Sequence, residues 1–323
     1  MRPLFHRTRR ACAALLLSCL GLVPPGLRAG TFEFKTNDVI AFVGGANLVA
    51  LAQDGTLETA LTQAHPHHRL RFRNLAWEGD TVFAQPREVN YPSLSHQLNR
   101  VEATVVVLHF GQTESLAGEA KRVDFLQAYD QLLSDFSRPQ RRLILVIPPP
   151  FEKGGGPLAV EVTARNASLR EYARGIRSLA EKHGAAVVDL FGSRTAASPA
   201  PLTADGWQWT AAGQHQIAAT FAQQLGWREA GFRLADSTRP GNPNAEIRRA
   251  VAAKNRLWFR ASRPTNWAFL AGDRTDQLFS RDPRDRNVRA FVEEMKQYDP
   301  LLTAAEQRID ELAAGSAEKE ETR

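Results

Sequence analysis

The chain has 323 residues, of which 43% are hydrophobic, so it is long enough to bury a sizeable core. It carries 41 basic and 35 acidic residues, but five of the basic and none of the acidic ones lie in positions 1–29, which leaves 36 against 35 in the rest. A nearly balanced remainder lacks the basic excess typical of nucleic-acid-binding proteins, and we expect no nucleic-acid partner.

Residues 1–29 are predicted to be an export signal. Arginines begin the segment, the apolar stretch Ala11–Val23 follows, and Leu27-Arg28-Ala29 forms a small-residue cleavage site. The apolar stretch is shorter than the roughly 20 residues that span a bilayer, so we expect no membrane span in the mature form. The predicted location is periplasmic or extracellular. Three alternatives stay open: a lipid anchor at Cys19, a twin-arginine signal and retention of the segment as an anchor.

Strand and helix patterns alternate along residues 38–225. Apolar, β-branched runs predict strands at Asp38–Val43, Leu70–Ala76, Thr104–Phe110, Arg142–Ile147 and Ala185–Phe191. Helical periodicity predicts helices at Asn47–Gln63, Lys121–Phe136, Thr163–His183 and Ala211–Leu225. This alternation predicts a three-layer α/β/α fold around a five-stranded parallel sheet. Ligands of such sheets bind beyond the carboxyl ends of the strands, so the loops there are the candidate site.

The character of the chain changes after residue 236. Residues 237–244, rich in Pro, Gly and Asn, are interpreted as a linker, and residues 245–289 combine an excess of Arg and Lys with interleaved aromatic residues. Asp299-Pro300 favours a helix start, and a charged, frayed tail is expected from Ser316. The predicted division is a signal peptide at 1–29, an α/β domain at 30–236 and a largely helical extension at 237–323.

Four short blocks occupy the predicted loops. Gly44-Gly45-Ala46-Asn47 follows the first strand, and Trp77-Glu78-Gly79-Asp80 follows the second. Gly111-Gln112-Thr113-Glu114-Ser115 follows the third, and Asp205-Gly206-Trp207-Gln208-Trp209-Thr210 precedes the last helix of the α/β domain. In order and context these blocks resemble those of the SGNH (GDSL-type) hydrolases, whose fold is flavodoxin-like and whose members hydrolyse esters. Residues 245–303 also resemble the tail of a bacterial, exported subgroup of that family.

Residue by residue, this resemblance implies a degenerate catalytic site. Ala46 stands at the position of the family's nucleophilic serine, and Gln208 at that of its general-base histidine. Thr113 replaces the asparagine of the oxyanion site, while Gly79 and Asp205 match the family's pattern. A methyl group cannot attack an acyl carbon, and an amide does not titrate near neutral pH. The resemblance therefore implies a non-catalytic binding or structural role.

An active ester hydrolase with relocated groups is the alternative. Ser115 would be its nucleophile, and His215 or His109 its base. The simpler interpretations are a helix-capping serine, a surface histidine and a hydrogen-bonded histidine at the edge of the core.

His65-Pro66-His67-His68 offers imidazoles for a transition metal, but no acidic residue is adjacent and proline fixes the backbone, so a solvated loop is favoured. We expect no metal and no cofactor.

Further residues of the loops are candidates for binding. Glu114 belongs either to an acidic rim or to a turn cap. Asn47, Ser115, Trp77, Trp207 and Trp209 flank the same loops, and aromatic rings at a cleft suit sugars as well as core packing. By analogy with esters cleaved by the family, the expected ligand is a carbohydrate or an acylated glycan. Residues 245–289 would contact a protein partner of the cell envelope, or else form a self-paired surface.

Overall fold

The computed structural model describes residues 32–137, 140–154, 161–194, 201–227 and 242–321. The predicted export signal, with both cysteines, therefore lies outside the described residues, as does most of the predicted linker. No helix in the described part of the chain is long and apolar enough to cross a membrane.

Five parallel strands form one sheet in the order β2-β1-β3-β4-β5. They are β1 (Val39–Gly44), β2 (Arg71–Asn74), β3 (Val105–His109), β4 (Arg142–Ile147) and β5 (Ala186–Asp189). Side chains of β1 alternate between two cores: Ile40 and Phe42 face one, Ala41 and Val43 the other. The predicted three-layer α/β/α fold is confirmed.

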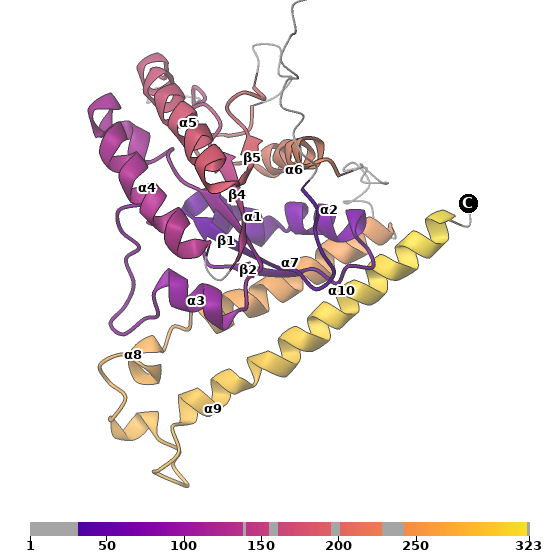
Figure 1. The fold of residues 1–323 in the computed structure, drawn as a ribbon. Coiled ribbons are helices and arrows are strands. Elements are labelled where there is room, and N and C mark those ends of the chain that lie inside the picture. Colours follow the sequence, from indigo (N-terminus) through magenta and orange to yellow (C-terminus); the bar gives the residue numbers. More distant parts are fainter. Residues whose placement is uncertain (1–31, 138–139, 155–160, 195–200, 228–241, 322–323) are drawn as a thin grey trace, which may run out of the picture.

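The helices divide between the two faces of the sheet (Figure 1). One face is covered by α1 (Ala46–Asp54), α2 (Thr56–Ala64) and α6 (Ala211–Leu225), and the other by α3 (Leu94–Arg100), α4 (Arg122–Phe136) and α5 (Thr163–His183). Short 3-10 helices, η1 (Glu114–Ala117) and η2 (Glu119–Lys121), precede α4. The bounds of α5 and α6 equal those predicted from the sequence.

The single helix predicted at Asn47–Gln63 is wrong, because it is broken at Gly55. This glycine has a φ of 75°, a left-handed conformation that ends α1 and begins α2. A Cβ here would lie 2.9 Å from Cγ1 of Val251, so the same glycine also lets a C-terminal helix approach closely.

The C-terminal region is helical, as predicted. It contains α7 (Pro243–Ser262), α8 (Trp267–Leu270), η4 (Leu278–Ser280), α9 (Ala290–Lys296) and α10 (Tyr298–Glu321). Helix α10 runs along α7, which packs against α1, α2 and β2 (Figure 1). Two expectations are corrected: α7 begins inside the predicted linker, and α10 continues past Ser316 instead of fraying there.

The outer edge of β2 is capped by side chains. Residues 71, 75 and 77 donate their N–H groups to β1 or to its flanking residues, so the carbonyls of the alternate residues 70, 72, 74 and 76 face outward. Arg71 donates to the carbonyl of Leu70 at 3.2 Å, and Arg73 to that of Phe72 at 3.0 Å. The next two outward carbonyls, of Asn74 and Ala76, accept from Trp258 and Arg263 of the C-terminal region. That region thus completes the edge of the sheet.

Candidate functional site

Ala46 is the first residue of α1 and lies, half-buried, just beyond the carboxyl end of β1. The turn before it requires glycine, because a Cβ on Gly44 would lie 2.5 Å from the carbonyl oxygen of His109. This close approach brings the loops after β1 and β3 together at the edge where ligands of parallel sheets bind.

A small cavity of about 40 Å³ lies over Ala46. The loops after β1, β2 and β3 line it, together with the loop before α6. Its lining residues are Gly45, Ala46, Asn47, Glu78, Asp80, His109, Phe110, Gly111, Gln112, Thr113, Glu114 and Trp207. Such a volume holds only a few water molecules or a similarly small group. The predicted loops therefore do converge, but around a narrow space.

Asn47 connects three of these loops through its side-chain amide. Its Nδ2 donates to Oε1 of Gln112 at 3.1 Å and to the carbonyl of Trp207 at 3.3 Å, and its Oδ1 accepts from the backbone N–H of Trp209 at 3.3 Å. Asn47 and Gln112 are both buried, so the bond between them is shielded from water. Asn47 was a predicted binding residue, but its amide is occupied in holding the site together.

The loop after β3 is held by a buried carboxylate. The two oxygens of Glu114 accept from the backbone N–H groups of Val82 at 2.9 Å and Gly111 at 2.8 Å. Burial raises the pKa of Glu114, although these N–H groups favour the ionised form. Glu114 thus joins the loops after β2 and β3, whereas its neighbour Thr113 is exposed.

Ser115 does not line the cavity. Its side chain is buried, and its hydroxyl donates at 2.8 Å to the carbonyl of Gln112, which precedes η1. The sequence had suggested this hydroxyl as a relocated nucleophile. The structure instead gives it a local bond in the loop, and no hydrogen bond joins it to an imidazole among the described residues.

Asp205 and Gln208 lie in one exposed turn before α6. An oxygen of Asp205 accepts from the backbone N–H groups of Trp207 at 2.9 Å and Gln208 at 2.7 Å. Burial alone would raise the pKa of Asp205, but the backbone hydrogen bonds together outweigh that effect, so the pKa is lowered. Asp205 therefore shapes the turn that carries Trp207 into the cavity lining, while Gln208 stays exposed outside that lining.

His109 ends β3 and lies under the cavity. It is buried against Trp209, with ring centroids 5.1 Å apart, and its Nε2 has no hydrogen-bond partner among the described residues. Burial lowers its pKa to about 4, so the ring is neutral at physiological pH. Because Nε2 is itself buried, this ring nitrogen is not exposed to the cavity, and His109 forms part of the packed support beneath it.

The loop after β2 is clamped from two sides. The guanidinium groups of Arg87 and Arg263 lie 4.4 and 4.5 Å from the ring centre of Trp77. Arg87 also forms a bidentate pair with the buried Asp80, and Arg263 bonds to Glu78 at 2.9 Å and to the carbonyl of Ala76.

Gly79, the predicted oxyanion donor, is exposed at the tip of this clamped loop, with open space around it. The sequence reasoning missed Gln112, Arg87 and Arg263. Gln112 had a signal in its place within the third block, and Arg263 had one in the resemblance over residues 245–303, whereas Arg87 had none.

The other two histidines considered as ligand or base, His65 and His215, lie outside the cavity lining. His65 lies against Phe34 and Trp227, and burial together with His68 lowers its pKa to about 4. His215, the other suggested base, is half-buried beside Arg248 and does not line the cavity. Within the described residues, no three His, Cys, Asp or Glu side chains are grouped so that they could hold a metal ion.

Comparison with known proteins defines the family. The model of the GDSL-like lipase/acylhydrolase family matches residues 45–216, more than half of the chain and all four loop blocks apart from Gly44. The chain belongs to this family. No curated protein is significantly similar to it in sequence.

Several solved structures resemble this chain at low sequence identity. BT4096, described as a gut microbial diltiazem-metabolizing enzyme, superimposes with a TM-score of 0.61 at 14% identity, over 89% of this chain and 96% of its own. LAE5, an alpha/beta hydrolase from the metagenome of Lake Arreo, Spain, has a TM-score of 0.47 and 19% sequence identity, over 60% of this chain and 97% of its own. Axe2, an acetylxylan esterase from Geobacillus stearothermophilus, has a TM-score of 0.45 and 15% sequence identity, over 62% of this chain and all of its own.

Proposed function

We propose that this chain is an exported, non-hydrolysing member of the GDSL-like lipase/acylhydrolase family that binds a short acyl group of a carbohydrate. The observation that carries the proposal is Ala46 at the start of α1, in the wall of the cavity where the family places its nucleophile. Thr113 supplies the only hydroxyl among the lining residues, and the one imidazole among them, that of His109, is buried, with a pKa of about 4.

The shape of the cavity supports a short acyl group. Its volume of about 40 Å³ accommodates a group the size of acetyl. The hydroxyl of the exposed Thr113 in its wall offers a hydrogen bond to a carbonyl or to water. Trp207 lines the same space, and its ring is held against Phe151, with ring centroids 5.5 Å apart. An indole fixed in this way supports stacking of a sugar ring outside the cavity.

Two measurements on the mature protein test the absence of hydrolysis. We expect no turnover of p-nitrophenyl acetate above the buffer rate, and no labelling by a fluorophosphonate, which reacts with activated serines. Turnover at an enzymatic rate that is lost in Ser115→Ala would overturn the proposal in favour of a relocated nucleophile.

Calorimetric titration tests the ligand. Acetylated xylo-oligosaccharides should bind, and the same oligosaccharides after alkaline deacetylation should bind at least about tenfold more weakly, since the acyl group fills the cavity. Trp207→Ala should weaken binding, whereas the matched control Trp267→Ala, which removes an indole outside the cavity lining, should not. Equal binding of both oligosaccharides would refute the acyl specificity.

A further inference from the structure

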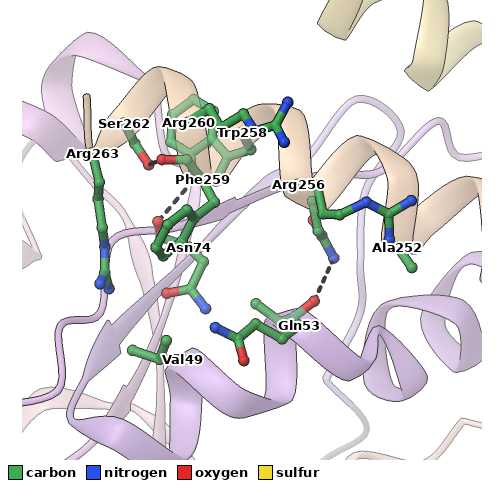
Figure 2. A pocket seen from close by; sticks show the side chains of 12 residues that line it. Val49, Gln53, Asn74, Ala252, Arg256, Trp258, Phe259, Arg260, Ser262 and Arg263 are labelled. Carbon is green, nitrogen blue, oxygen red and sulfur yellow. Dashed lines mark hydrogen bonds between the residues drawn. The ribbon is translucent and has the colours of Figure 1, made fainter. Parts of the chain in front are cut away.

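A larger cavity of about 350 Å³ lies between α1 and α7 (Figure 2). Its volume exceeds that of the cavity over Ala46 and falls in the range of small-molecule sites. The floor comes from the outer face of α1, at Val49, Ala52 and Gln53, and the roof from the last turns of α7. This site therefore exists only because the C-terminal region packs on the α/β domain.

Apolar groups form much of its wall and are held in place. Trp258 donates from Nε1 to the carbonyl of Asn74 at 2.8 Å, which fixes its ring over the end of β2. Phe259, 41% exposed, lies under the guanidinium of Arg263 at 4.9 Å. A preorganised aromatic wall binds the flat or aliphatic body of a ligand without the cost of ordering side chains.

All the charged side chains that line this cavity are basic. Arg256, Arg260 and Arg263 line it, and no acidic residue does. Only Arg263 is paired, with Glu78; the exposed Arg256 and Arg260 have no acidic partner among the described residues.

Two acidic groups of the neighbouring helices α1 and α2 are already engaged. Asp54 pairs with Arg248 at 2.6 Å, and Glu58 pairs with Lys254 at 2.6 Å. The rim therefore carries unneutralised positive charge beside an apolar wall.

We propose that this cavity binds an amphiphilic anion, a molecule with an aromatic or aliphatic body and a carboxylate, sulfate or phosphate group. The body lies against Trp258 and Phe259, and the anionic group lies at the rim with Arg256 and Arg260. Guanidinium groups match such oxyanions in geometry and charge. This site is separate from the cavity over Ala46, and neither proposal depends on the other.

Two fluorescent probes of similar body but different charge test the proposal. These are 8-anilinonaphthalene-1-sulfonate, an anion, and N-phenyl-1-naphthylamine, which is neutral. We expect saturable binding of the sulfonate with one site per chain, weakened by added salt. The double variant Arg256→Ala/Arg260→Ala should weaken the sulfonate about tenfold and leave the neutral probe within about twofold.

Two further variants locate the site. Arg249→Ala removes an exposed arginine of the same helix outside the cavity and should change neither affinity. Ala252→Trp fills the cavity and should abolish binding of both probes, with the thermal unfolding curve as a check of folding. The proposal is overturned if the double arginine variant, whose positions are exposed, binds the sulfonate as tightly as the native chain.

Discussion

Lys254 of α7 and Glu58 of α2 form an ion pair of 2.6 Å, and their side chains are only 1% and 7% exposed. Asn255 donates to the other oxygen of Glu58 at 2.9 Å, so the carboxylate is satisfied on both sides. Burial lowers the pKa of Lys254, while Glu58 opposes that shift. The C-terminal region is thus fastened to the α/β domain by a charge pair that is costly to break.

Loss of one partner of this pair should destabilise the whole chain. Lys254→Met leaves Glu58 buried and unpaired, which should lower the free energy of unfolding by about 3–5 kcal/mol in urea denaturation. The double variant Glu58→Leu/Lys254→Met should recover most of that loss, because no uncompensated charge remains. If the double variant is as unstable as the single one, packing at this position matters more than charge.

Acid should destabilise the protein through His109. Its pKa is about 4 in the folded chain against 6.5 for an ordinary histidine, so the unfolded chain binds the extra proton first as the pH falls. The contribution of the neutral His109 ring to the free energy of unfolding is fully present above pH 6.5. It is lost progressively between pH 6.5 and 4, by about 3 kcal/mol in all. Unfolding free energies measured across this range should fall less steeply for His109→Gln than for the control His67→Gln, which removes an exposed histidine. Parallel profiles for the two variants would contradict the assignment.

Removal of Arg263 should loosen the loop that carries Gly79. Arg263→Ala loses the stack on Trp77, the ion pair with Glu78 and the bond to the carbonyl of Ala76. We expect a loss of about 1–2 kcal/mol, seen as a lower melting temperature, and faster amide exchange at residues 77–80. Arg249→Ala, an exposed arginine outside this contact, is the matched control and should leave both measurements unchanged.

Restoring the family residues should restore some hydrolysis. In the triple variant Ala46→Ser/Thr113→Asn/Gln208→His, we expect the rate on p-nitrophenyl acetate to rise by on the order of 10²-fold over the native chain, the lower range for a positioned base. Thr113→Asn/Gln208→His, which keeps Ala46, should show no such gain. If the triple variant is equally inactive, the exposed turn at residue 208 no longer points toward α1.

The sheet could be predicted from the sequence because its signal is local. Runs such as the one at Arg142–Ile147 are apolar at consecutive positions, and the observed strand has the same bounds. The break at Gly55 was missed because the residues on both sides continue the helical pattern, and its cause, the approach of Val251, is nearly 200 positions away.

The candidate site, too, could be predicted from the sequence only in part. Parallel strands put their carboxyl ends at one edge, so the convergence of the four loops followed from chain order alone. The contacts that Arg263 makes with Glu78 and Trp77 did not, because nothing near either residue marks the other. Nor could the sequence show that the space over Ala46 is so small, since cavity volume depends on how side chains from separate loops pack.

The capped edge of β2 has a consequence for how the protein behaves at high concentration. Outward carbonyls are what an incoming strand would need for pairing, and here those of residues 70, 72, 74 and 76 are already bonded to side chains. Proteolytic loss of the C-terminal region would release two of them, at Asn74 and Ala76, and uncover the strand. The trimmed chain would then offer a template for strand addition, so the C-terminal helices also protect the protein against aggregation.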